Sequence, residues 1–217
     1  MKRCPGPQVT IDRDVALTLV RDRRLPADVA LRGELASACG ILGLRCNITE
    51  AEAELGEPLN LREAALPEQP TAIRALLYQR LGASVQRAAA ATAGRRPLLR
   101  VLLLPQLAPA DAAAAAALAE LEGLGLPADH EALAGLNGDD RGGAVLLDAT
   151  RLAQNDPTRR VALIAHELGH ALGLGHPSAA REGAVMAPVG ACAGGLDAAE
   201  AEQARRAIDH AAAAGAR

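Results

Sequence analysis

Three histidines and one glutamate lie close together between His166 and His176. His166 and His170 are four residues apart, so on a helix both imidazoles lie on one face and can reach one ion. His176 follows and adds a third nitrogen ligand. A catalytic zinc has three protein ligands and an open fourth position for water, whereas structural sites usually have four ligands, with cysteine prominent. No cysteine lies inside this segment, so the pattern predicts a catalytic zinc site.

Glu167 directly follows the first of these histidines, which places its carboxylate beside the expected ion. Zinc lowers the pKa of its bound water to roughly 7, and a neighbouring carboxylate can take the proton as the water attacks a carbonyl. We therefore expect Glu167 to be the general base, and then the proton shuttle to the leaving amine, in the hydrolysis of an amide.

The elements around the segment predict how its side chains are positioned. Asp156 is a good N-cap and Pro157 suits the first helical position. Apolar residues then recur at steps of three and four, which indicates a buried helical stripe: Val161, Ile164, Leu168 and Ala171. Gly173 offers a left-handed C-terminal stop, after which the chain can turn back and deliver His176 from outside the helix.

The run His-Glu-Leu-Gly-His-Ala-Leu-Gly-Leu-Gly-His resembles the signature of the metzincin zinc endopeptidases, and its wording is similar to the matrixin branch. Met186 matches the methionine that in this family forms a tight turn beneath the zinc ligands. The resemblance implies that Gly173 and Met186 support the site. Matrixins typically have Met-Tyr-Pro at this turn, whereas this chain has Met186-Ala187-Pro188.

The same resemblance implies where a substrate would bind. Pro188 and Val189 would line the outer wall of the primary specificity pocket. In metzincins a strand at the sheet edge lies beside the cleft, and here a strand predicted from Ala144 to Thr150 precedes the active-site helix. We hypothesise that a peptide pairs in extended form with Ala144, Val145 and Leu146. The strand order, which the sequence does not give, decides whether this strand is the edge.

The expected fold is α+β and metzincin-like, with a small twisted sheet, a long helix on its N-terminal side, the active-site helix and a C-terminal helix. The long helix is predicted from Thr71 to about Thr92, and a buried strand from Leu98 to Leu104. Residues 111–121 are rich in alanine, which occupies seven of the eleven positions, and should be helical. A final helix should run from Leu196 to about Ala213.

Residues 1–68 are expected to form a helical N-terminal region, either a prodomain or a scaffold, ahead of a catalytic domain at residues 69–217. One helix should begin near Pro26 and end near Leu42, and Thr49 with Glu52 predicts a short second one. Cys4, in a proline-rich tip, is faintly similar to the cysteine switch of matrixin propeptides and raises the question of latency.

The cysteines lack the Cys-x-x-Cys spacing of a second zinc site. We expect Cys39 and Cys46 to be buried free thiols, with a disulfide as the alternative in an oxidising compartment. Asp139 and Asp140, in a glycine-rich turn, suggest calcium, although the oxygen ligands around them are few.

Charge and composition limit the classes of binding partner that we expect. A formal charge of −3 and a pI near 6.0 give no reason to expect nucleic acid or an acidic membrane. Charges interrupt every apolar run well short of a membrane span. The chain as written has no signal-peptide core and reads as cytoplasmic, while a start further upstream would make it secreted. The expected partner is a peptide or protein substrate; the oligomeric state stays open.

Three alternatives stay open beside a zinc metalloendopeptidase. A thermolysin-like site would use a downstream glutamate, Glu182 or Glu200, as third ligand. A zinc-binding, non-catalytic module that recognises peptides or regulates a partner would bind the ion without turnover that depends on Glu167. A poorly folded relic is suggested by the absence of Phe and Trp.

Overall fold

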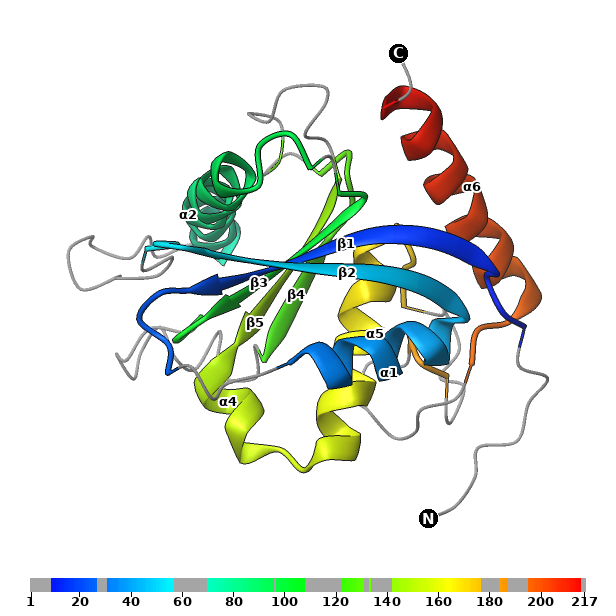
Figure 1. Ribbon diagram of the computed structural model, residues 1–217, viewed down its shortest axis with the longest axis horizontal. Coiled ribbons are helices and arrows are strands. Elements are labelled where there is room, and N and C mark those ends of the chain that lie inside the picture. The colour runs from blue at the N-terminus through cyan, green and yellow to red at the C-terminus, as the bar shows by residue number, and fades with distance from the viewer. Residues whose placement is uncertain are drawn as a thin grey trace.

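A mixed five-stranded sheet forms the centre of the computed structural model, and helices cover both of its faces (Figure 1). The strand order is β2-β1-β3-β5-β4, and all strands are parallel except β4, which pairs antiparallel with β5. The expected α+β class is confirmed. The strands are β1 (Arg13–Asp22), β2 (Leu44–Ala53), β3 (Leu99–Leu104), β4 (Gly123–Leu126) and β5 (Gly143–Asp148). The structure describes residues 9–26, 31–56, 70–95, 97–107, 122–130, 133, 142–176, 184–186 and 195–215.

The helices segregate between the two faces of the sheet. α2 (Pro70–Ala91) covers one face, while α1 (Arg32–Leu42) and α5 (Pro157–Ala171) lie side by side under the other (Figure 1). The short α4 (Ala149–Gln154) links β5 to α5, and α6 (Ala198–Gly215) packs near the start of β1. The predictions of the long helix, the β3 strand and the C-terminal helix are confirmed, whereas the alanine run at 111–121 lies outside the described residues. Among the described helices, none is long and apolar enough to cross a membrane.

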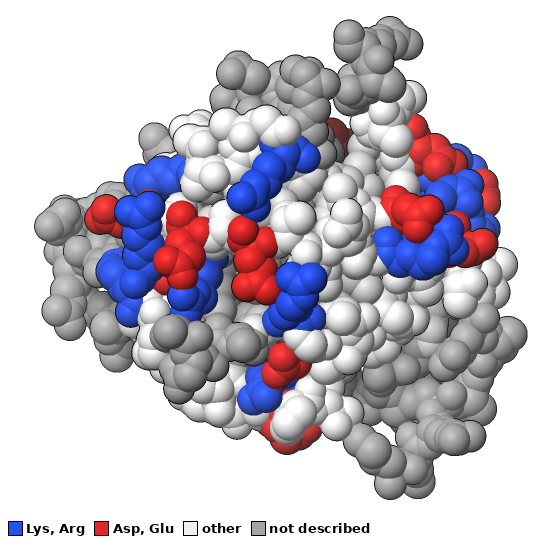
Figure 2. Space-filling view, viewed as in Figure 1, with Lys and Arg blue, Asp and Glu red and all other residues white. Residues whose placement is uncertain are grey.

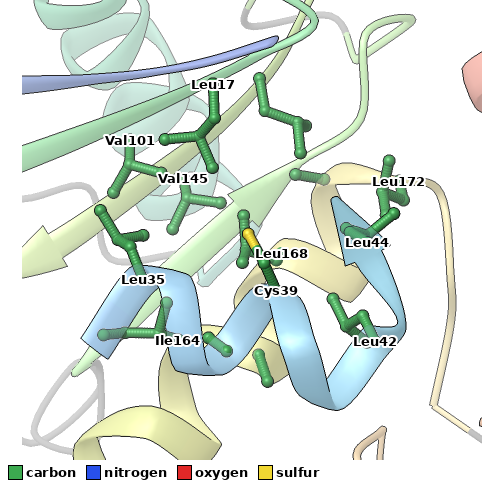
Figure 3. Packing of buried hydrophobic residues seen from close by; sticks show 14 of the residues in the cluster. Leu17, Leu35, Cys39, Leu42, Leu44, Val101, Val145, Ile164, Leu168 and Leu172 are labelled. Carbon is green, nitrogen blue, oxygen red and sulfur yellow. The ribbon is translucent and has the colours of Figure 1, made fainter. Parts of the chain in front are cut away.

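Alternation along the strands divides the core into two clusters. Val145 and Leu147 point to the α1 and α5 side, and Ala144 and Leu146 point to the α2 side. Figure 3 shows the first cluster, where Leu17, Val101 and Val145 of the sheet meet Leu35 of α1 and Ile164 and Leu168 of α5. This packing holds α5 against the sheet through aliphatic contacts.

The expected helical N-terminal region is wrong for two of its three described elements. α1 ends at Leu42 as predicted, but β1 and β2 flank it and belong to the same sheet as β3 and β5. The Thr49 to Glu52 pattern is not a capping box. Thr49 faces Thr18 across the β1–β2 pair, with their hydroxyls 2.9 Å apart, and Glu52 forms an ion pair with its register partner Arg21. Cross-strand pairs therefore produce a spacing that mimics a helix start. β1 and β2 are therefore strands of the same sheet as β3, β5 and β4.

The two edges of the sheet differ in chemistry. β2 carries charged and polar side chains along its exposed side, and Figure 2 shows alternating basic and acidic groups on this face. Arg32 with Glu50 and Arg45 with Asp14 form two of these ion pairs. Charge of this kind protects an edge strand from pairing with another chain. β4, at the opposite edge, has the sequence Gly-Leu-Gly-Leu and carries no charged side chain.

A disulfide joins Cys39 to Cys46, with the two Cα atoms 6.2 Å apart. The expectation of free thiols is therefore wrong. Gly43, with a φ of 68°, turns the chain sharply at the end of α1, so that β2 returns past the helix and the two cysteines face each other. Cys39 is buried in the same core cluster as Leu35 and Leu42 (Figure 3).

Candidate metal centre

Helix α5, which carries the first two histidines, begins and ends as its sequence predicts. The Asp156 carboxylate accepts hydrogen bonds from the amides of Thr158 and Arg159, at 2.9 and 3.1 Å, and Pro157 occupies the first turn. Three of the four predicted stripe residues are fully buried, namely Ile164, Leu168 and Ala171. The predicted amphipathic helix is confirmed.

Gly173 ends the helix in the way its position predicts. Its φ is +82°, the Leu174 amide donates to the Gly169 carbonyl at 3.0 Å, and the Gly173 amide donates to the His170 carbonyl at 2.9 Å. These two bonds form a Schellman motif, which needs a residue in the left-handed conformation at this place. The turn reverses the chain and brings His176 back over the helix.

The three histidines converge. The Nε2 atoms of His166 and His170 are 3.1 Å apart, those of His170 and His176 are 3.1 Å apart, and those of His176 and His166 are 3.2 Å apart. His166 and His170 are half-buried, whereas His176 is exposed, so one side of the cluster is open to solvent. Together they form a group that can hold one metal ion.

Backbone carbonyls fix the tautomer of two of these rings. His166 Nδ1 lies 2.8 Å from the Val185 carbonyl oxygen, and His170 Nδ1 lies 2.8 Å from the Leu174 carbonyl oxygen. Because a carbonyl only accepts, each Nδ1 carries the proton and each Nε2 of the neutral ring has a free lone pair. The short Nε2 to Nε2 separation between these rings is therefore not a hydrogen bond. Two lone pairs that face one point repel each other unless a cation lies between them.

Burial keeps the two half-buried rings in the neutral form that binds metal. It lowers the pKa of His170 to about 4, against the opposing effect of the Leu174 carbonyl. Burial also lowers the pKa of His166, again against the opposing effect of its own carbonyl partner. Both imidazoles are consequently available as ligands at neutral pH.

Met186 supports the helix from below. It is fully buried, and a Cβ at Gly169 would overlap its sulfur, so Gly169 leaves the space that the methionine fills. The preceding residue, Val185, provides the carbonyl that orients His166. The same short segment thus orients His166 by a hydrogen bond and packs against the helical turn between His166 and His170.

Glu167 is 7% exposed and lies between α5 and the edge strand β4. Burial raises the pKa of its carboxyl to about 7, while a hydrogen bond from the Gly125 amide acts in the opposite direction. A carboxyl with a pKa near neutrality can both accept and return a proton, which is the property that general acid–base chemistry requires.

Strand β4 passes directly over the helix at this point. A Cβ at Gly123 would lie 2.8 Å from Glu167 Cγ, and one at Gly125 would lie 2.6 Å from His170 Cβ. Two glycines spaced by two therefore let the strand backbone approach the helix closely. The alternation of glycine in Gly123-Leu124-Gly125-Leu126 is the signal in the sequence for this close approach, and these glycines are not among the predicted site residues.

The free side of β4 follows from its pairing. The Asp148 amide donates to the Glu122 carbonyl at 3.1 Å, so Glu122 and Asp148 are a hydrogen-bonded antiparallel pair. Because such pairs alternate with pairs that are not bonded, the N–H and C=O groups of Gly123 and Gly125 point away from β5. They line the open edge beside Glu167.

The hypothesis that Ala144, Val145 and Leu146 form the open edge is wrong. All three are fully buried in β5, which pairs with β3 on one side and β4 on the other. The short strand β4, between β3 and β5 in sequence, takes the edge position instead.

Several predicted residues lie outside the described part of the chain. They are Cys4, Asp139, Asp140, Glu182, Pro188 and Val189. Glu200, the other glutamate considered as a third ligand, is described. Its carboxylate accepts from the Asp197 amide at 2.8 Å, and Asp197 accepts from the Glu200 amide at 2.8 Å. This reciprocal pair caps the start of α6, which accounts for Glu200 without a metal.

No protein-family model matches the sequence, and no curated protein matches it either.

Proposed function

We propose that the chain is a zinc-dependent metalloendopeptidase of metzincin type, in which His166, His170 and His176 bind the ion and Glu167 transfers the proton. The observation that carries this proposal is the convergence of three imidazole nitrogens beside a buried carboxyl of raised pKa. A buried carboxyl on the residue directly after one histidine of a metal-ligand set is the combination that amide hydrolysis needs.

Zinc suits this donor set. Three imidazoles with one open position are typical of a catalytic zinc, and Zn–N bonds of about 2.0–2.1 Å in a tetrahedron place nitrogens about 3.3 Å apart. The observed separations of 3.1 to 3.2 Å are close to that value. The carbonyls of Val185 and Leu174 accept hydrogen bonds from His166 and His170, and hydrogen bonds of this kind orient zinc-bound histidines in known sites. A bound zinc would supply Lewis acidity, which polarises a carbonyl and makes water acidic near neutral pH.

Glu167 would perform the proton transfers. Glu167 directly follows His166, which would place its carboxylate near a bound metal, and its burial limits the access of water to the charge. In the first step it accepts a proton from the attacking water, and in the second it donates that proton to the leaving amine. The Gly125 amide would hold the carboxylate in place between these steps.

The edge of β4 would bind the substrate backbone. The outward N–H and C=O of Gly123 and the outward C=O of Gly125 offer the hydrogen bonds that an extended peptide needs in order to add a strand, while the Gly125 N–H is bonded to the Glu167 carboxylate. The edge lies against Glu167, so a peptide bound there would present one of its amide bonds to the metal centre. A strand at the sheet edge beside the cleft also matches the metzincin arrangement. This substrate geometry favours an endopeptidase.

The decisive experiment measures turnover of a quenched-fluorescent peptide library by three forms of the zinc-loaded protein: the parent, Glu167→Ala and the control Glu202→Ala. Glu202 is an exposed glutamate of α6, so its loss tests for a general effect of removing a carboxylate. We expect the parent and the control to cleave peptides, and Glu167→Ala to lose about 100- to 10,000-fold in rate. Zinc content, measured on the same samples by atomic emission, should stay at one ion per chain in all three.

Two outcomes would reject the proposal. The parent could fail to cleave any peptide although zinc is bound and the protein melts cooperatively. That outcome would point to a non-catalytic zinc module. Equal turnover by the parent and Glu167→Ala would show that the cleavage comes from a contaminant or from another site.

A further inference from the structure

A groove of about 580 Å³ lies between α6, the C-terminal end of α5 and the chain that follows β4. Its floor is apolar and includes Leu172, together with residues at the starts of β3 and β5. Its rim is polar, with Asp129 on the β4 side and Arg206 and His210 on the α6 side. None of the residues to which we assign metal binding or proton transfer lines it.

The groove is continuous with the proposed active site through two elements. Leu172 and Gly173 line it and immediately follow His170 in the chain, and Gln203 of α6 donates to the Gly173 carbonyl at 2.6 Å. On the other side, β4 ends at Leu126 and the next three residues form the opposite wall. The open edge of β4 therefore leads directly into the groove.

The direction of β4 determines which end of a bound peptide reaches the groove. Antiparallel pairing is the more stable arrangement for an added strand. A peptide antiparallel to β4 has the residues that precede its cleaved bond next to the later residues of β4. Because Gly125 lies beside Glu167, and one strand residue spans about 3.3 Å, Asp129 would face the peptide about three to five residues upstream of that bond.

The charges on the rim indicate the side chain that this part of the peptide should carry. Arg206 and His210 are exposed, and neither has an ion-pair or hydrogen-bond partner in the described part of the chain. Arg206 is always charged, and its guanidinium can bind a carboxylate through two parallel hydrogen bonds. The floor, which lacks charge, suits an aliphatic side chain.

We propose that this groove is a substrate subsite for the peptide upstream of the cleaved bond, with an aliphatic side chain on its floor and a carboxylate beside Arg206. This inference depends on the proposed peptidase function and names a substrate class for it: extended peptides with an acidic and an aliphatic residue about three to five positions before the cleaved bond.

The test compares peptides that share one cleavable core, chosen from the library. The first begins two residues before the cleaved bond; the second adds Glu and Leu further upstream, and the third carries Lys in place of Glu. We expect kcat/KM for the Glu–Leu peptide to exceed that of the short one by about tenfold, since a single methylene group in an apolar pocket is worth about 10- to 200-fold. The kcat/KM of the Lys peptide should exceed that of the short peptide by a smaller factor.

A pair of variants assigns the effect to the groove. Arg206→Glu should reverse the order of the Glu and Lys peptides, because the charge on the α6 wall changes sign. Arg23→Glu is the matched control, since Arg23 is an exposed arginine at the far end of β1 and should leave the order unchanged. We expect the ratio of the two kcat/KM values to change by about tenfold in Arg206→Glu alone.

The outcomes separate this inference from the proposed function. If the short peptide is cleaved and extension brings no gain, or if only extension downstream of the cleaved bond brings one, the subsite is rejected while the peptidase function stands. If Arg206→Glu keeps the parent's preference for Glu, the assignment of Arg206 is rejected. Failure of every peptide would reject the function and the subsite together.

Discussion

The sulfur of Met186 lies against Gly169, in the space that any larger residue at position 169 would fill. Gly169 is the residue immediately before the second helical histidine, and Met186 follows the residue whose carbonyl orients the first. The methionine segment and the helix are therefore matched in shape next to the two helical histidines. Any change at this contact should displace the histidines relative to each other.

We expect Gly169→Ala to weaken zinc binding. The added methyl group would overlap the Met186 sulfur, and overpacking of this kind costs about 1–3 kcal/mol. Because disturbed support around ligands typically lowers metal affinity by about 10- to 100-fold, a competition titration with a chromogenic chelator should detect the change.

Gly40→Ala provides the control for Gly169→Ala. Gly40 is also a helical glycine, but a Cβ there meets nothing within 4 Å. This variant should keep the parent's zinc affinity and gain about 0.5–1 kcal/mol of helix stability. An unchanged zinc affinity in Gly169→Ala would show that the contact with Met186 does not position the ligands.

Helix α5 was predictable because the residues that determine it are neighbours in the sequence. Asp156, Pro157 and Gly173 define the ends of α5 by capping rules that involve only neighbouring residues. The spacing of His166 and His170 requires nothing beyond the periodicity of a helix. The structure places these elements as predicted and brings His176 to the same point.

The sheet was less predictable because strand pairing is non-local. Thr49 and Glu52 read as a helix start until their partners on β1 are known. β4 is only four residues long, too short for a periodic pattern, and half of it is glycine. Which strand forms the edge depends on the strand order, and the sequence of β5 does not itself reveal that β4 pairs with its outer side.

We expect Gly125→Ala to reduce peptide turnover while zinc stays bound. A Cβ there would overlap the Glu167 carbonyl oxygen and approach His170, so β4 must move away from α5. A displacement of about 1 Å in a substrate-positioning element can cost about 100-fold in rate. Steady-state kinetics with the best library peptide, together with zinc analysis of the same sample, measure the effect. Gly33→Ala, where a Cβ meets nothing within 4 Å, should be as active as the parent.

If Gly125→Ala retains full activity, β4 does not position the substrate. If it loses zinc together with activity, the strand acts on the metal site and not on the peptide. Only the loss of turnover with retention of the ion supports the role that we propose for the edge.

Asp22 makes stability depend on pH. Its fully buried carboxylate accepts from the amides of Arg24 and Leu55, both at 2.9 Å, and from the Arg24 side chain at 2.8 Å. Burial acts to raise the pKa of this carboxyl, but these hydrogen bonds outweigh it and hold the pKa below its ordinary value. The stabilisation is therefore complete above the unfolded-state pKa of about 3.9 and is lost as the pH falls through the lower folded-state pKa.

We expect Asp22→Asn to lower the free energy of unfolding by about 1.5–3 kcal/mol at pH 7, because hydrogen bonds to a charged group are lost. Urea denaturation from pH 7 to pH 2 should show this difference shrinking below about pH 4. Asp129→Asn, at an exposed position, should match the parent throughout. If the difference in the free energy of unfolding stays constant with pH, the charge of Asp22 is not what stabilises the folded protein.

The disulfide between Cys39 and Cys46 should stabilise the contact between α1 and β2. The two cysteines are separated by seven positions, and the chain-entropy model gives about 2.5 kcal/mol for a loop of this length. We expect the double variant Cys39→Ala/Cys46→Ala to lose about this much in urea denaturation under oxidising conditions. Under conditions that reduce the parent's disulfide, the free energies of unfolding of the two proteins should differ much less.

Since such disulfides persist in oxidising compartments, a stabilising bond between Cys39 and Cys46 would favour function outside the reducing cytosol. Peptide mapping that finds both thiols free in oxidised, folded protein would contradict the bond and that inference with it.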